Sequence, residues 1–162
     1  MVNLQLVFPE IFISLSIMFL LILGVFKKKS STLIQNLSLF VLLITAVIIF
    51  NETLGIKQAL LFNNSVIIDY LSSFMKIVIL LAAFLVLVIS SNYLKIFKLF
   101  KIEYPILILS SVLGMMVMIS SNDLIVFYMG LELQSLALYV LATFNRDQLK
   151  SSEAGLKYFV LS

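Results

Sequence analysis

The chain has 162 residues, of which 62% are hydrophobic and only 12% are charged. Soluble domains typically contain about 45–50% apolar and about 25% charged residues. A soluble domain of this length still exposes about a third of its unfolded surface, so its core could not bury this much apolar side chain. The composition therefore excludes a soluble globular protein and predicts an integral membrane protein.

Residue types that are absent from the sequence exclude several kinds of cofactor site. Cysteine and histidine are both absent, so the chain cannot ligate haem through His, hold an iron–sulfur cluster or build an ordinary zinc site. The net charge of +3 is modest, and the basic residues are dispersed among apolar segments, which argues against nucleic-acid binding. We expect no cofactor on this chain and no cleaved signal peptide, since the first six residues hold no Lys or Arg and a long apolar run follows.

Long apolar runs recur along the chain, and about 20 such residues cross a bilayer as a helix. They predict an all-α membrane protein with five complete transmembrane helices and the start of a sixth. A Ser-rich stretch with an acidic residue, Lys150–Glu153, is typical of a helix start. The expected spans are about 7–26, 33–50, 69–90, 105–121 and 124–144, with the sixth beginning at about 152.

The loops differ sharply in basic residues. Lys57 falls on one side of the predicted spans, and Lys76 and Lys157 fall inside spans. All the other basic residues fall on the opposite side. By the positive-inside rule that side faces the cytoplasm or matrix, which places the N-terminus outside. The residues on the basic side are Lys27, Lys28, Lys29, Lys95, Lys98, Lys101, Arg146 and Lys150.

Ionisable residues inside a span cost about 2.5–3.5 kcal/mol each on insertion scales, so each is a candidate functional residue. Glu132 is the strongest candidate. It follows Asp123 by nine residues, which places it about 13–14 Å into a core about 30 Å thick. We expect a carboxylate near the midplane that changes its protonation state. The alternative is a neutral, hydrogen-bonded Glu that holds helices together.

The residues around Glu132 form a pattern. Tyr128, Glu132, Ser135 and Tyr139 follow helical spacing and predict one polar stripe on an otherwise apolar helix. A buried carboxylate without a partner takes up a proton, whereas a nearby ammonium keeps it ionised. The protonation state of such a carboxyl group can be changed by its surroundings.

The remaining intramembrane charges allow two interpretations. Lys157 lies about 8 Å into the predicted sixth helix. It either extends to the inner surface or pairs with a carboxylate on a neighbouring helix and exchanges protons. Glu10, Asp69 and Lys76 lie near the outer ends of their helices, where we expect a local ion-pair cluster.

Two segments, Gly130–Leu136 and Ser152–Phe159, carry a specific resemblance, together with the Asp123-Leu124 turn. They closely resemble subunit N of bacterial NADH:quinone oxidoreductase, whose mitochondrial counterpart is subunit 2 of complex I. Pro9-Glu10 and Glu103–Pro105 look like the same family. The resemblance touches the whole chain, and its last third is the most specific part.

The resemblance implies a proton-translocating subunit in the membrane arm of a respiratory complex that couples electron transfer from NADH to quinone to proton pumping. Glu132 matches the family's midmembrane glutamate and Lys157 a family lysine, so both are candidate proton-transfer residues. The family resembles cation/proton antiporter subunits with inverted repeats and discontinuous helices. Residues 1–162 are accordingly expected to form the N-terminal part of a single antiporter-like transmembrane domain.

The resemblance also assigns the redox chemistry to other subunits, which use NADH, FMN, iron–sulfur clusters and quinone. It implies other membrane-arm subunits and the lipid bilayer as partners, and the bacterial inner membrane as the location, with the mitochondrial inner membrane as the alternative. Family members contain more helices than this chain, including those with the usual lysine partner of Glu132. A natural fragment, a split subunit and a truncated sequence all stay open, as do a related antiporter or membrane-bound hydrogenase subunit and a non-functional remnant.

Overall fold

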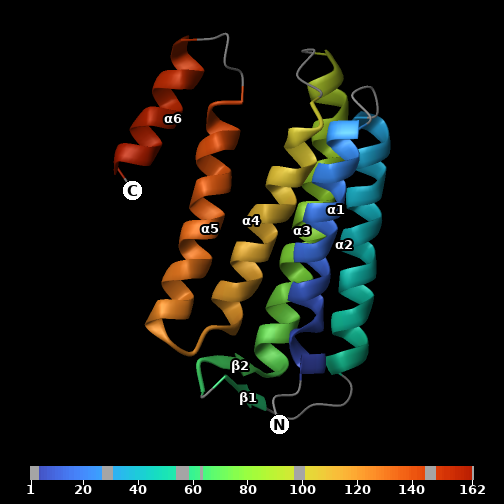
Figure 1. Ribbon diagram of the computed structural model, residues 1–162, viewed down its shortest axis with the longest axis vertical. Coiled ribbons are helices and arrows are strands. Elements are labelled where there is room, and N and C mark those ends of the chain that lie inside the picture. The colour runs from blue at the N-terminus through green and yellow to red at the C-terminus, as the bar shows by residue number, and fades with distance from the viewer. Residues whose placement is uncertain are drawn as a thin grey trace.

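The computed structural model describes residues 4–26, 31–53, 59–62, 64–96, 101–144 and 149–161. These residues form six α-helices, a short 3-10 turn and one small β-hairpin (Figure 1). In chain order the elements are η1 (Leu4–Val7), α1 (Phe8–Phe26), α2 (Ser31–Thr53), β1 (Ala59–Leu61), β2 (Val66–Ile68), α3 (Tyr70–Ile96), α4 (Glu103–Ser120), α5 (Leu124–Ala142) and α6 (Leu149–Leu161).

Five of the described helices, α1 to α5, are long and apolar enough to cross a membrane. The all-α membrane fold expected from the sequence is therefore confirmed. The helix ends differ from those expected, since α2 continues to Thr53 and α3 to Ile96. With its 27 residues, α3 is about 40 Å long at 1.5 Å per residue, which exceeds an apolar core of about 30 Å. Polar side chains at the helix ends reach water, so nothing forces the helices to stop with the apolar run.

The start of α6 also differs from the sequence prediction. The helix begins at Leu149 rather than at about residue 152. The Ser151 hydroxyl donates a hydrogen bond of 2.9 Å to the carbonyl oxygen of Ala142. Ser151 therefore ties the first turn of α6 to the end of α5 instead of capping its own helix.

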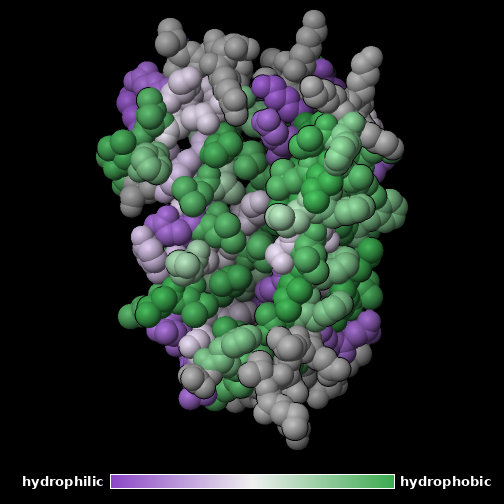
Figure 2. Space-filling view, in the orientation of Figure 1, coloured by the Kyte–Doolittle hydropathy of each residue, from purple (hydrophilic) through white to green (hydrophobic). Residues whose placement is uncertain are grey.

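Helices α1 to α4 pack around a common core, while α5 packs chiefly on α4, and α6 on α5 (Figure 1). Within its apolar window α5 is only 17% buried, compared with 44% for α4. Figure 2 shows hydrophobic side chains over much of the face of the molecule seen there, as a lipid environment requires. The core includes the fully buried side chains of Ile13, Leu20, Leu42, Leu80, Leu87, Leu109, Val112 and Met116.

A β-hairpin, which the sequence analysis did not anticipate, covers one end of the bundle. Strands β1 and β2 are antiparallel, with Ala59 opposite Ile68, and the turn between them places Asn64 at φ 68°, a conformation that Asn tolerates better than most residues. The Asn122 side chain donates to the carbonyl of Asn64 at 2.7 Å, and its backbone N–H donates to the carbonyl of Ser65 at 2.9 Å. These bonds fasten the hairpin to the turn between α4 and α5.

Two glycines bring the backbones of α4 and α5 into direct contact. A Cβ added to Gly114 would lie 2.7 Å from the backbone nitrogen of Gln134 and 2.8 Å from the carbonyl oxygen of Gly130. One added to Gly130 would lie 2.9 Å from the carbonyl oxygen of Gly114. Close helix contact through small residues is common in membranes, where packing replaces the hydrophobic driving force.

We expect Gly114→Ala to destabilise the protein by about 1–3 kcal/mol, the usual cost of overpacking, because the opposing atoms are backbone and cannot rotate away. Thermal unfolding of the purified protein in detergent, followed by circular dichroism, measures the loss. Gly24→Ala is the matched control, since its Cβ would meet the Cγ2 methyl of Ile102, a side chain, at 2.7 Å. An equal loss in both variants contradicts the backbone-contact explanation.

Candidate functional site

Glu132 lies near the middle of α5. It is eight residues beyond Leu124, the first residue of the helix, so its backbone is about 12 Å along the helix axis from that end. Asp123 caps the helix by accepting a hydrogen bond of 3.4 Å from the N–H of Ile125. The Asp123 turn expected from the sequence thus fixes the start of α5 and sets the depth of Glu132.

The side chain of Glu132 lines a hollow of about 300 Å³ between α4, α5 and α6. The other polar groups of the hollow include Ser135 and Tyr139 of the predicted stripe and Tyr158 of α6. The fourth member of the stripe, Tyr128, forms a side-chain hydrogen bond with Glu132. The lining is completed by Met118, Leu131, Gln134 and Leu138.

The lining of the hollow combines the carboxyl group of Glu132 with several hydroxyl groups. A hydroxyl can donate to an ionised carboxylate or accept from a protonated one, so this environment suits both protonation states of Glu132. The hydroxyl of Ser135 donates to the backbone carbonyl of Glu132 at 3.1 Å. A hollow of this size with several polar groups also has room for ordered water.

Aromatic contacts hold α6 against α5 at this hollow. The ring of Tyr139 meets the ring of Tyr158 edge-on with centroids 4.8 Å apart, and the ring of Phe159 at 5.6 Å. Gly155 permits the close approach of α6, because a Cβ there would lie 1.8 Å from the Cγ2 atom of Thr143. The side chain that α6 contributes to the lining of the hollow is therefore Tyr158.

Lys157 does not line the hollow. Its Nζ pairs with Glu153 Oε1 at 2.6 Å, one turn earlier on the same helix, and both side chains are more than half exposed, at 67% and 61%. The described residues thus do not bring Lys157 and Glu132 together. A pair of this kind at the surface of a helix contributes about 0.3–0.5 kcal/mol.

A second charged site lies at the hairpin end of the bundle. Lys76 Nζ of α3 lies 2.5 Å from Glu10 Oε1 of α1, and the side chains are only 3% and 10% exposed. The ion-pair cluster expected from the sequence is confirmed for Glu10 and Lys76, but Asp69 takes no described part in it. The Asp69 carboxylate instead accepts from the N–H of Ser72 at 2.7 Å and so caps the start of α3.

The third member of this group is Glu52, which the sequence analysis missed. Glu52 interacts electrostatically with both Glu10 and Lys76. It belongs to α2, which runs one turn further than the apolar pattern indicated. The direction of the chain could have placed Glu52 near Glu10, since α1 starts and α2 ends on the same side of the membrane. We call Glu10, Glu52 and Lys76 the three-helix charge cluster.

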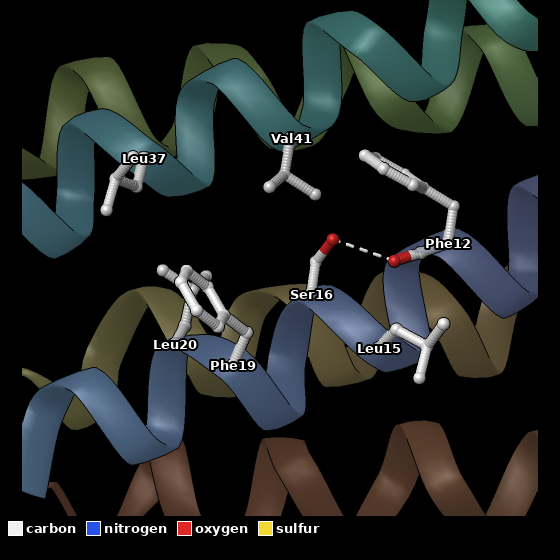
Figure 3. A pocket seen from close by; sticks show the side chains of 7 residues that line it. All are labelled: Phe12, Leu15, Ser16, Phe19, Leu20, Leu37 and Val41. Atoms are coloured by element: carbon white, nitrogen blue, oxygen red, sulfur yellow. Dashed lines mark hydrogen bonds between the residues drawn. The ribbon is translucent and has the colours of Figure 1, made fainter.

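Other features at the surface carry no comparable chemistry. An apolar groove of about 350 Å³ runs between α1 and α2, and Ser16 is its polar lining residue (Figure 3). The Ser16 hydroxyl already donates to the carbonyl of Phe12 at 2.7 Å. Among the described residues no group of three or more Asp and Glu could hold a metal ion.

The basic residues that suggested the orientation lie mainly outside the described part of the chain: Lys27, Lys28, Lys29, Lys57, Lys98 and Arg146 have no described placement. Lys95, Lys101 and Lys150 are described and lie at the end of the bundle opposite the hairpin, where α3 ends and α4 and α6 begin (Figure 1). Lys101 Nζ lies over the Phe144 ring, 5.7 Å from its centroid. These three lysines agree with a basic face at that end.

The fold and the hollow define the class of the protein: a multi-helix membrane protein with a carboxyl group in a hollow between its helices. Residues 121–162, which include all of α5 and α6, match the family described as NADH:quinone oxidoreductase/Mrp antiporter, transmembrane. That range contains both Glu132 and Lys157. A chain of respiratory complex I from Thermus thermophilus has the same fold, with a TM-score of 0.78 and 22% identity over 94% of this chain and 32% of that chain.

Within this class the chain is similar to NADH-quinone oxidoreductase subunit N. It is 69% identical to that subunit of Pelagibacter ubique over 99% of this chain and 34% of the relative. It is 48% identical to that of Maricaulis maris, over 98% and 33%, and 46% identical to that of Paramagnetospirillum magneticum, over 96% and 32%. The chain thus spans about a third of the length of these relatives, and the resemblance to subunit N inferred from the sequence is confirmed.

Removal of the buried Lys76 ammonium should be costly. We expect Lys76→Met to destabilise the protein by about 3–5 kcal/mol, because it leaves the Glu10 charge buried without its partner. The double variant Glu10→Gln/Lys76→Met should lose less, since neither charge of the pair remains. Thermal unfolding in detergent measures both.

Glu153→Gln, which breaks the exposed pair with Lys157, is the control and should cost less than about 0.5 kcal/mol. If the double variant is no more stable than Lys76→Met alone, the penalty does not come from an uncompensated charge.

Proposed function

We propose that this chain is part of a proton-translocating membrane-arm subunit of a respiratory NADH:quinone oxidoreductase. The observation that carries the proposal is Glu132, a carboxyl group halfway along a transmembrane helix, in a hollow whose lining includes the hydroxyl groups of Ser135, Tyr139 and Tyr158. An ionisable group at this depth is costly and is retained for function more often than for packing. The high identity to subunit N of several bacteria supports the same assignment.

In the proposed mechanism Glu132 takes up and releases a proton as a neighbouring lysine moves or changes its charge. An ammonium close by favours the ionised carboxylate, and its withdrawal favours the protonated form. Water in the hollow would connect Glu132 to the next donor and acceptor. Tyr128, whose side chain interacts with Glu132, would orient the carboxyl group in both states.

The wider assignments belong to the same proposal. Residues 1–162 would be the N-terminal part of one antiporter-like transmembrane domain, with other membrane-arm subunits as partners. NADH, FMN, iron–sulfur clusters and quinone would be handled elsewhere in the complex. By the positive-inside rule the lysine-rich end faces the bacterial cytoplasm, and the hairpin end faces outward.

A second candidate function is a subunit of a cation/proton antiporter. The description of the matched family favours keeping it, since that family covers Mrp antiporters as well as the oxidoreductase. The two functions differ in whether proton movement depends on NADH oxidation. Proton transport driven by a sodium gradient, without NADH, would assign the antiporter.

The central test is Glu132→Gln in the complete subunit within its membrane complex. We expect NADH-driven proton pumping to fall at least about tenfold, since loss of a positioned acid–base group typically costs more than that. Pumping is measured in inverted membrane vesicles with a pH-sensitive dye, alongside NADH:quinone turnover. Glu103→Gln, which removes an exposed carboxylate at the start of α4, is the matched control. Unchanged pumping and turnover in Glu132→Gln would remove its role.

The role of Lys157 needs its own pair of variants. If Lys157 transfers protons, Lys157→Met should lower pumping several-fold while Glu153→Gln leaves it close to normal. If Lys157 serves only as the partner of Glu153, the two variants should behave alike, with a stability loss of about 0.3–0.5 kcal/mol and normal pumping. The same vesicle assay, combined with thermal unfolding, separates these outcomes.

A further inference from the structure

The three-helix charge cluster is not used by the mechanism proposed for Glu132. Its members come from α1, α2 and α3, whereas Glu132 lies on α5. Glu10 pairs directly with the Lys76 ammonium, and Glu52 interacts electrostatically with both. With all three ionised, the cluster carries one excess negative charge at the hairpin end of an apolar bundle.

One oxygen of this cluster is left without a partner. Glu10 Oε1 accepts from Lys76 Nζ at 2.5 Å, but Glu10 Oε2 is fully buried and has no hydrogen-bond partner in the described structure. The whole residue is only 8% exposed. A buried carboxylate oxygen without a hydrogen bond carries a desolvation penalty that a bound proton or a donor would relieve.

The other titratable groups described at this end do not neutralise the excess charge. Asp69 is engaged with the backbone of Ser72, Asp123 caps α5, and Tyr70 is 71% exposed. The described residues of the β-hairpin, and of α4 near its C-terminal end, are not titratable. Lys76 is therefore the one cation that the described part of this end contributes.

We propose that the three-helix charge cluster binds one exchangeable proton on its two carboxyl groups, in addition to the protons of the Lys76 ammonium. The proton comes from water at the hairpin end and returns to it. Its binding makes the cluster neutral, with Lys76 positive, one carboxylate negative and one carboxylic acid that can donate a hydrogen bond. Glu52 is half-buried at the end of α2 and is more accessible than the buried Glu10.

The test measures proton binding in the purified membrane complex that contains the complete subunit. Infrared difference spectra between acidic and alkaline buffer record the carbonyl stretch of protonated carboxyl groups, and exchange into heavy water identifies that band. We expect Glu52→Gln to remove the contribution of one carboxyl group, because the remaining Glu10–Lys76 pair is already neutral. Glu52→Asp keeps a titratable group and should keep a band at a shifted position. The control Glu103→Gln should keep the cluster band.

Two results would overturn the proposal. If neither Glu52→Gln nor Glu52→Asp alters the carboxyl bands, the cluster holds no exchangeable proton and serves structure alone. If replacing choline by sodium at constant pH abolishes the wild-type band, the site takes a metal cation rather than a proton. Because the readout is proton binding and not pumping, the outcome does not depend on the role of Glu132, and Glu132→Gln should leave the cluster band in place.

Discussion

The cost of placing charge in an apolar environment determines how this chain is built. Its few intramembrane charges are each handled differently. Lys76 and Glu10 neutralise one another in a buried pair, and Lys157 and Glu153 pair at the surface of α6. Glu132 has no ammonium beside it among the described residues; its side chain interacts with Tyr128 and lines a hollow that also holds hydroxyl groups. The first arrangement holds helices together, whereas the last leaves a group whose charge can change.

Helix placement could be predicted from the sequence because lipid imposes a simple rule. Apolar runs of about 20 residues become spans, and all five predicted spans are helices in the structure. The place of Glu132 near the middle of its helix followed from the same arithmetic, since α5 begins directly after the expected turn at Asp123. The helix ends were less predictable, because polar residues near the membrane surface are compatible with both helix and loop. For that reason Glu52, near the end of α2, was not identified from the sequence.

Which side chains the packing of the helices brings together could be learned only from the structure. Helical spacing placed Tyr128, Glu132, Ser135 and Tyr139 on one stripe, but it could not show that α6 contributes Tyr158 to it. Lys157 and Tyr158 are adjacent in sequence, but Lys157 pairs with Glu153 while Tyr158 lines the hollow that holds Glu132, and only the packing of α6 on α5 decides this. That packing depends on backbone clearance at Gly155, which a sequence pattern does not specify.

The hairpin and its bonds to Asn122 have a mechanical consequence. They fasten the start of α5 to the bundle, while its other end is joined to α6 through the Ser151–Ala142 hydrogen bond. A helix that is held at one end and pushed at the other tilts about the end that is held. A displacement of α6 would thus move Glu132 sideways, with little movement along the helix axis. The carboxyl group would change neighbours while keeping its depth.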